Sequence, residues 1–239
     1  MRPIGYSTGA LALSDVRGAL SMLRGSRASA IELSALRLAE LGPLLEMVSS
    51  LDLSAFSHIS VHAPSRFTAA EEAGVVDALA TVLPLGWPIV LHPDAIHDFQ
   101  AWRQFGGALA IENMDKRKPI GRTVQELERV FDRLPDASFC FDLGHARQID
   151  RTMNEAYFLV KELGPRLRQL HVSEVNTQSR HDQISRAAVC AFQKVARWVP
   201  ESVPLILESP ATVGEIEAQM SMAREALSAV PGDAAMANV

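Results

Sequence analysis

The sequence has few cysteines and no long apolar run. Two cysteines among 239 residues, Cys140 and Cys190, cannot form the disulfide framework of a small secreted domain. No apolar stretch reaches the roughly 18 residues that a membrane span needs, and the first residues lack the apolar core of a signal peptide. We therefore expect a cytoplasmic protein without a membrane partner.

The sequence also lacks a strong charge of either sign. Charged residues make up 21% of the chain, and the formal net charge is -5. A mildly acidic chain does not indicate nucleic-acid binding. The one tight basic cluster, Lys116 to Lys118, suits a solvated turn, or a phosphate or carboxylate contact at the rim of a site. A small-molecule substrate is therefore the expected partner, and nucleic acid is disfavoured.

The apolar residues, 48% of the chain, fall in short runs at fairly regular intervals. Most runs are too short for helices and rich in Ile, Val, Leu or Phe, so they predict strands of a buried parallel sheet. Several begin about 30 residues apart, which leaves room for one strand, one helix and two loops. The runs are Ile4–Tyr6, Ala30–Leu33, His58–Val61, Pro88–Leu91, Ala108–Ile111, Phe139–Phe141, Leu167–Leu170 and Val203–Leu207.

Helical patterns fill the intervals between these runs. One of them places Val124, Leu127, Val130, Phe131 and Leu134 on a single stripe, as in a helix packed on a sheet. A chain of 239 residues is close to the typical length, about 250, of a (β/α)8 barrel. The rival is a doubly wound open sheet, but no G-x-G-x-x-G follows the first run. We predict an α/β fold, a single (β/α)8 TIM barrel over residues 1–230, with a flexible tail over 231–239.

Six successive predicted strands, the third to the eighth, end in His, Asp or Glu. The carboxyl ends of barrel strands meet at one mouth, so these side chains should converge there. Buried like charges repel one another, and divalent cations relieve this by neutralising carboxylates and accepting imidazole lone pairs. The sequence therefore predicts a metal centre built from His62, His92, Glu112, Asp142, His171 and Glu208, with His145 three residues after Asp142.

Each of these residues alone has a plainer interpretation. A single histidine at a strand end is usually a polar residue with a satisfied hydrogen bond, but that interpretation suits six successive strand ends poorly. His58 and His97 lie elsewhere and are interpreted as structural. A metal-free alternative uses Glu112 and Glu208 as an acid and base pair, as in glycosidases. The surrounding histidines favour a metal.

The ordered set of ligands resembles the xylose isomerase-like barrel superfamily, and within it the endonuclease IV pattern. The resemblance covers most of the chain, from about His58 to Pro210 in motifs. It implies two metals that share Glu112 as a bridging ligand. The first would be bound by His62, His92 and Glu112, and the second by Glu112, Asp142, His171 and Glu208.

The same resemblance implies a third metal, held by His145 and by an Asp-Arg-His motif after the seventh strand. Here the motif reads Ser179-Arg180-His181, so His181 matches and serine replaces the aspartate. Serine is a poor metal ligand, and Asp182 or Glu174 would have to substitute. The expected content is therefore two or three divalent ions per chain, Zn, Mn or Fe.

The resemblance implies several activities. The first is hydrolysis of a phosphoester or similar small anionic substrate; DNA repair is disfavoured because the loop after His62 is short. The second is isomerisation or epimerisation of a sugar or sugar phosphate on a single metal, in which two glutamates move a proton. A multi-iron oxygen-dependent enzyme and a non-catalytic metal-bound scaffold are further alternatives. The catalytic candidates are Glu112, Glu208 and His145.

Specificity in such barrels lies in the loops after the strands. These loops are short, which suggests that a partner subunit of a homo-oligomer covers the site. The expected substrate contacts are Arg180, Glu174 and Asn113. Other polar candidates for the rim are Ser7, Thr8, Glu32, Ser65, Arg66, Arg147 and Asn176.

Overall fold

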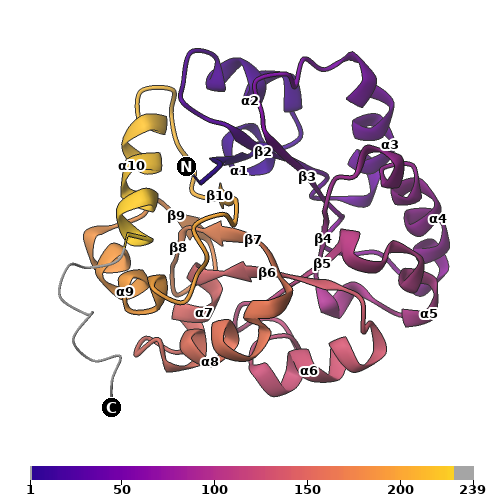
Figure 1. Ribbon diagram of the computed structural model, residues 1–239. Coiled ribbons are helices and arrows are strands. Elements are labelled where there is room, and N and C mark those ends of the chain that lie inside the picture. Colours follow the sequence, from indigo (N-terminus) through magenta and orange to yellow (C-terminus); the bar gives the residue numbers. More distant parts are fainter. Residues whose placement is uncertain (1, 229–239) are drawn as a thin grey trace.

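The structure, a computed structural model, describes residues 2–228, and the predicted tail over 231–239 lies outside the described residues. Eight parallel strands form a closed barrel with helices around it (Figure 1). Each predicted strand is present, with its ends within two residues of the prediction. The strands are β1 (Ile4–Ser7), β2 (Ala30–Ser34), β3 (His58–His62), β4 (Ile89–Leu91), β5 (Leu109–Glu112), β6 (Ser138–Asp142), β7 (Leu167–Val172) and β10 (Leu205–Leu207).

Parallel pairing of β10 with β1 closes the ring, which confirms the predicted TIM barrel. The predicted stripe, which runs along α6 (Val124–Arg133) to Leu134, is buried, as a helix packed on the barrel requires. No described helix has the length and apolarity to cross a membrane. The helices are α1 (Thr8–Ala12), α2 (Val16–Leu23), α3 (Leu38–Met47), α4 (Ala69–Ala80), α5 (Phe99–Trp102), α6 (Val124–Arg133), α7 (Leu143–Ile149), α8 (Asn154–Leu163), α9 (Arg186–Ala196) and α10 (Ile216–Ala226).

The apolar core lies mainly between the barrel and its helices. One large cluster joins residues of the strands with the buried faces of the helices. The inside of the barrel holds a separate small cluster of Val90, Ala110 and Cys140. Glu32 and Gln169 are also fully buried, although they are polar. The helices thus supply the hydrophobic packing, which leaves the barrel interior able to carry polar groups.

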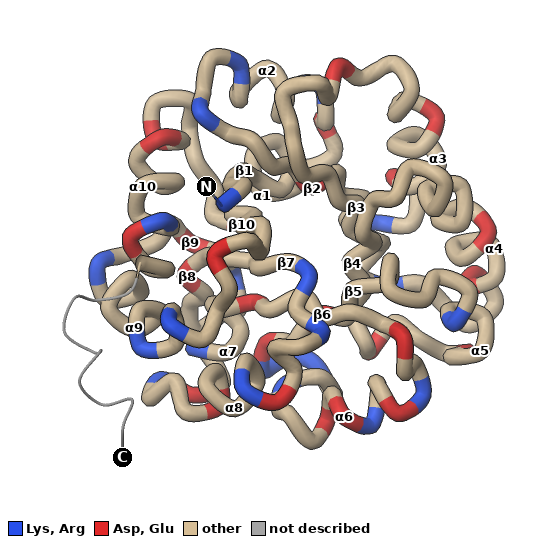
Figure 2. The backbone as a smooth tube through the Cα atoms, viewed as in Figure 1, with Lys and Arg blue, Asp and Glu red and all other residues tan. Residues whose placement is uncertain are grey.

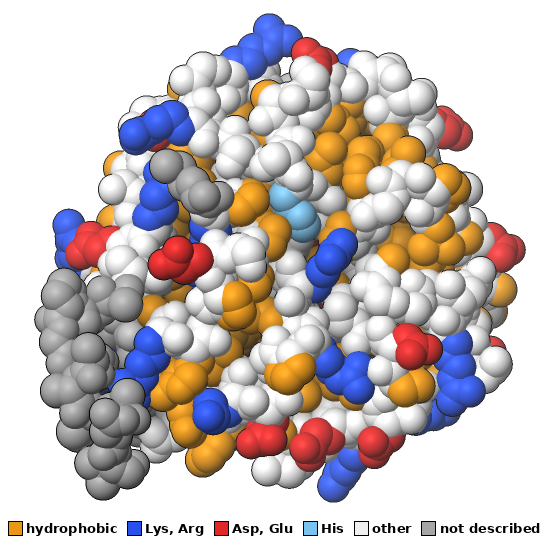
Figure 3. Space-filling view, in the orientation of Figure 1, with side chains coloured by type: hydrophobic (Ala, Val, Ile, Leu, Met, Phe, Trp, Pro, Cys, Tyr) orange, Lys and Arg blue, Asp and Glu red, His pale blue; other side chains and the backbone are white. Residues whose placement is uncertain are grey.

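Charged residues lie mostly on the outer helices and loops (Figure 2). On the face shown in Figure 3, positive and negative side chains are mixed around the edge, with no large patch of one sign. Such mixed charges are typical of a solvated outer surface.

The barrel requires a very close approach of β1 to β2. Gly5 is the register partner of Ala30, and a Cβ on Gly5 would lie 1.6 Å from the Ala30 carbonyl oxygen. No side chain fits there, so the pairing of these two strands depends on glycine.

We predict that Gly5→Ala lowers the free energy of unfolding by about 4 kcal/mol or more, because β1 must move away from β2. Gly74→Ala is the matched control. Gly74 lies in α4 with open space around its Cβ position, so this change should stabilise the helix by up to about 1 kcal/mol. Urea unfolding followed by circular dichroism measures both, and equal stability of the two variants would contradict the description of the β1–β2 contact.

Candidate metal centre

All eight predicted ligands lie at one mouth of the barrel. Seven of them come from the carboxyl ends of the barrel strands or from the first residues after them, His181 comes from a hairpin after β7, and Asp142 and His171 are direct register partners. Within residues 2–228 the potential ligand atoms form groups that lie within 4.8 Å of one another. The groups are His62, His92 and Glu112; Glu112, Asp142, His171 and Glu208; Asp142, His145 and His181; and Glu32, His62 and Glu208.

Glu112 is the central carboxylate of this mouth and is almost fully buried. Its Oε2 lies 3.4 Å from Nε2 of His62 and 3.2 Å from Nε2 of His92. Its Oε1 lies 3.0 Å from Nδ1 of His171 and 3.6 Å from Nδ1 of His145. Each oxygen therefore faces a different set of imidazoles, which is the arrangement a bridging carboxylate needs.

Asp142 and His145 are positioned by the start of α7. The Oδ1 of Asp142 accepts the His145 backbone N–H at 2.6 Å and caps the helix. The other oxygen, Oδ2, points to the mouth and lies 3.5 Å from Nδ1 of His145. That nitrogen is 2.9 Å from the carbonyl oxygen of Asn113, to which it can donate. A single helix cap thus orients two potential ligands.

Asn113 holds the backbone of the potential ligand Asp142. Its side-chain amide donates to the Asp142 carbonyl oxygen at 2.8 Å and accepts the Asp142 N–H at 2.7 Å. Both ends of the amide are engaged, so Asn113 holds β6 in place next to β5. Direct contact of Asn113 with a substrate stays a prediction.

His181 reaches the mouth on a hairpin of β8 (Glu174–Val175) and β9 (His181–Asp182). Ser179 is buried, and its hydroxyl is hydrogen-bonded to Gln148 at 2.8 Å. The predicted substitutes for the missing aspartate lie elsewhere, since Asp182 accepts from Asn176 and Glu174 pairs with Arg147 at 2.7 Å. In the described structure the group around His181 therefore takes its carboxylate from Asp142.

Two buried carboxylate oxygens at the mouth, Oδ2 of Asp142 and Oε2 of Glu208, have no hydrogen-bond partner within the described chain, and the same holds for Oε1 of Glu32 inside the barrel below them. Buried polar atoms are nearly always paired, so orphan oxygens indicate a missing ligand such as a cation. Imidazole nitrogens surround them, and mixed nitrogen and oxygen donors suit Zn, Mn and Fe. The residues present thus fit divalent metal ions.

Without metal, the mouth retains protons. Burial opposes ionisation of Glu112, but the imidazoles around it outweigh burial and hold its pKa well below its ordinary value. Burial raises the pKa of Glu208 to about 8; His171 opposes this shift, and Glu112 and Asp142 add to it. Burial also opposes charging of His171, yet nearby acidic groups such as Glu208 raise its pKa well above normal.

A cavity of about 440 Å³ opens above these ligands. Its wall carries four cationic side chains. Lys118 is anchored by Asp94 at 2.8 Å and approaches Nδ1 of His92 at 3.3 Å. Arg117 pairs with Asp115 at 2.8 Å. The other two, Arg37 and Arg66, are exposed.

Arg66 is the cation of this wall that has no ion pair or hydrogen bond within residues 2–228. The predicted contact Arg180 is exposed on the hairpin and is not among the residues that line the cavity. The basic cluster of residues 116–118 thus contributes two side chains to the wall, which favours its interpretation as an anion contact.

The prediction that Glu32 and Thr8 lie at the rim is wrong, because both are fully buried. Glu32 lies inside the barrel, below His62 and His171. The sequence contains a signal for this position. Side chains along a barrel strand point alternately to the interior and to the helices, and a charged residue in the middle of a buried run must face the interior.

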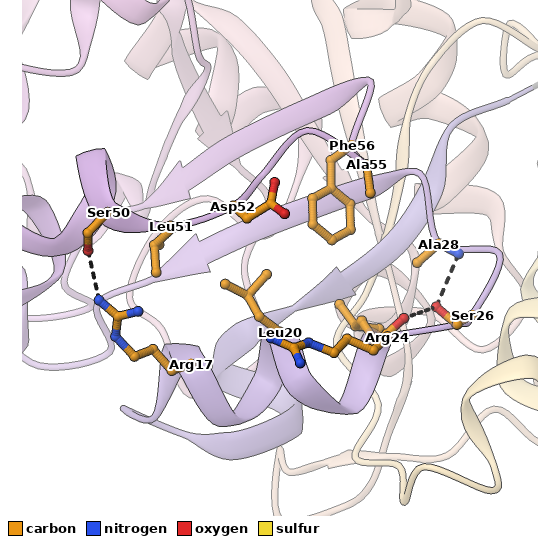
Figure 4. A pocket seen from close by; sticks show the side chains of 12 residues that line it. Arg17, Leu20, Arg24, Ser26, Ala28, Ser50, Leu51, Asp52, Ala55 and Phe56 are labelled. Atoms are coloured by element: carbon orange, nitrogen blue, oxygen red, sulfur yellow. Dashed lines mark hydrogen bonds between the residues drawn. The ribbon is translucent and has the colours of Figure 1, made fainter.

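A second cavity, of about 450 Å³, lies between α2 and the segment before β3 (Figure 4). Its two sides are joined by a hydrogen bond of 2.7 Å from Arg17 to Ser50. Its wall combines apolar residues such as Leu20, Leu51 and Phe56 with the charged residues Arg24 and Asp52. None of the ligand-group residues lines it.

Solved structures resemble this chain over most of its length. The endonuclease IV of Thermus thermophilus is 17% identical; the match covers 94% of this chain and 98% of the other, with a TM-score of 0.61. A xylose isomerase domain protein from Alicyclobacillus acidocaldarius subsp. acidocaldarius is 11% identical over 95% and 98%, with a TM-score of 0.64. A proposed sugar phosphate isomerase/epimerase from Anabaena variabilis ATCC 29413 is 13% identical over 87% and 84%, with a TM-score of 0.53.

At these identities the likeness establishes the fold alone, and it agrees with the predicted TIM barrel. No protein-family model matches the chain, and no curated protein matches it by sequence.

We predict that metal binding at the group containing His171 and Glu208 releases protons. Both residues hold protons in the metal-free protein at neutral pH, because the pKa of each is raised, and a metal ligand must be deprotonated. The affinity of this group for a divalent metal should therefore rise with pH between about pH 6 and 8. The rise should be roughly tenfold per pH unit for each proton released.

Calorimetric titration with Zn²⁺ in two buffers of different ionisation enthalpy counts the protons released. A zinc affinity that does not change over this pH range would contradict the prediction.

Proposed function

We propose that this chain is a divalent-metal-dependent enzyme that hydrolyses a phosphoester or a similar small anionic substrate. The observation that carries the proposal is the position of Glu112. Its two oxygens belong to two different ligand groups, directly below a cavity with cationic walls. A carboxylate shared in this way is typical of sites that hold two metals close together.

The proposed ligands of the first metal are His62, His92 and Glu112, and those of the second are Glu112, Asp142, His171 and Glu208. A third metal would use Asp142, His145 and His181. Metals bound at such a site lower the pKa of water and stabilise a leaving oxygen. The protein itself contributes ligand orientation, as in the capping of α7 by Asp142, and burial, which excludes bulk water from Glu112.

Substrate recognition is proposed to depend on the cationic wall. Ion pairs with Asp94 and Asp115 fix the positions of Lys118 and Arg117 and offset much of their positive charge. Arg66 has no such partner within the described residues and can turn to an anionic group. A guanidinium binds phosphate oxygens through two parallel hydrogen bonds. His145 and His181, whose ring centroids lie 5.3 Å apart, are proposed to contact the reacting group or to hold the third metal.

A second candidate function is isomerisation or epimerisation of a sugar phosphate on one metal. The observation that favours it is the group of Glu112, Asp142, His171 and Glu208, which supplies four ligands without His62 or His92. Glu112 and Glu208 would then move the proton on and off carbon. The sugar phosphate isomerase/epimerase among the structural neighbours supports this candidate.

We predict that His92→Ala separates the two functions. In the hydrolase it should remove one metal equivalent and lower the hydrolysis rate of bis(p-nitrophenyl) phosphate by about 100-fold or more, because the first metal loses a ligand. In the single-metal isomerase it should leave the metal content unchanged. His97→Ala is the control, since His97 bonds to the Phe67 carbonyl oxygen away from the mouth.

Metal analysis and the rate of hydrolysis are measured on both variants. Retention of all metal and of the full rate in His92→Ala would contradict the hydrolase proposal.

We also predict that Arg66→Ala raises KM for this phosphodiester by roughly tenfold, because a charge-assisted hydrogen bond is lost. Metal content should not change, since Arg66 lies outside every ligand group. Arg17→Ala, in the second cavity, is the matched control and should leave KM unchanged. Equal KM values for the two variants would refute the role of Arg66.

A further inference from the structure

Glu32 is a buried carboxylate beneath the proposed metal ligands. Its side chain is fully shielded from solvent. The Oε2 atom accepts from the Ser60 hydroxyl at 3.1 Å and from the Gln169 side-chain amide at 2.7 Å. Nε2 of His171 lies 3.1 Å from the same oxygen. Three groups from β3 and β7 thus fix one oxygen of Glu32.

This contact determines which nitrogen of His171 carries a proton. An ionised carboxylate only accepts hydrogen bonds, so Nε2 of His171 must donate to Glu32. Nδ1 then faces the other way, 3.0 Å from Oε1 of Glu112 and 3.5 Å from Oε1 of Glu208. Its lone pair is free for a cation among those carboxylates once the Nδ1 proton leaves.

A second set of contacts keeps Glu32 in this position. The Gln169 side-chain oxygen lies 2.7 Å from Nε2 of His58, which can donate to it. The Gln169 amide nitrogen is thereby turned to Glu32. It also lies 3.0 Å from Nε2 of His171, so both groups donate to the same Glu32 oxygen. The polar chain runs from His58, at the start of β3, to the metal ligands.

Glu32 could instead bind a cation directly, with His62 and Glu208. His62 has one nitrogen available for a metal, because its Nδ1 is engaged with the Ala63 carbonyl oxygen at 2.7 Å. The available Nε2 also faces Glu112 and belongs to the group with His92. A separate cation at Glu32 would take this ligand from the first metal, so the contact with His171 is the better account of Glu32.

We propose that Glu32 is the positioning residue of the second metal, acting through His171. It fixes the His171 tautomer and ring orientation, so that Nδ1 is the ligand atom. The inference rests on the proposed function in that a metal binds to His171. Carboxylates behind a ligating histidine typically contribute about 10- to 100-fold in metal affinity.

The test compares Glu32→Gln with Glu72→Gln. Glu72 is another buried glutamate that accepts three N–H groups, from His97, Asp98 and Trp102, all at 2.8 Å and away from the mouth. Both changes remove a buried charge, and the Glu32 change alone touches His171. Zinc affinity is measured by competition with a chromophoric chelator, after circular dichroism confirms folding.

We expect Glu32→Gln to weaken one zinc equivalent by about 10- to 100-fold and to leave the other unchanged. Glu72→Gln should lower stability without changing either affinity. Wild-type affinity of both equivalents in Glu32→Gln would overturn the inference and leave the proposed function standing. A wild-type protein that binds no zinc would overturn both.

A measurement on the wild type is independent of the folding of any variant. Nitrogen-15 NMR of the zinc-loaded, histidine-labelled protein, assigned through single histidine substitutions, reports the tautomer of His171. A protonated Nε2 with zinc-bound Nδ1 is expected. A protonated Nδ1 with zinc on Nε2 would overturn the inference.

Discussion

The structure depends on one electrostatic constraint: three carboxylates and five imidazoles are gathered in a single barrel mouth, with a fourth carboxylate, Glu32, buried beneath them. Burial raises the free energy of each isolated charge, and like charges raise it further. Glu112 lies at the centre, where each of its oxygens faces two imidazoles. Imidazoles alone leave an oxygen of Asp142 and one of Glu208 without a hydrogen-bond partner in the described chain. Divalent cations would complete this arrangement, which is why we propose that the mouth is a metal centre.

Packing and hydrogen bonds elsewhere in the chain stabilise the fold in spite of these buried charges. Hydrophobic packing is concentrated between the barrel and the helices, so stability does not require an apolar barrel interior. Close backbone contacts, such as Gly5 against Ala30, keep the ring tight. Hydrogen bonds from Asn113 to Asp142 and the helix cap at α7 then orient the ligands on the rigid strand ends. Fixed elements rather than loops thus position the ligands, as precise sites require.

Much of this could be predicted from the sequence. The short apolar runs predict the strands, because a buried parallel strand needs an uninterrupted apolar stretch. The ligands follow from the residue directly after each run, since all parallel strands of a barrel end at the same mouth. His62, His92 and His171 are found in this way, and the structure places them within hydrogen-bond range of Glu112 or close to it.

Other features depend on contacts that a single sequence does not encode locally. The role of Glu32 requires the stagger between β2 and β7, strands that are far apart in the sequence. Asp142 is the carboxylate near His181, at a position in the motif where Ser179 supplies none, and this depends on how the β8–β9 hairpin folds over the mouth. The exposure of Arg180 and the approach of Arg66 to the cavity are likewise set by loop conformation, which follows tertiary packing more than local pattern.

Metal content per chain tests the central claim most directly. The protein would be purified without added metal, stripped with a chelator, reconstituted with zinc or manganese, and analysed by elemental mass spectrometry. The account predicts two or three tightly bound equivalents, with the loss of one in His92→Ala. A reconstituted wild-type protein that retains no metal would contradict it.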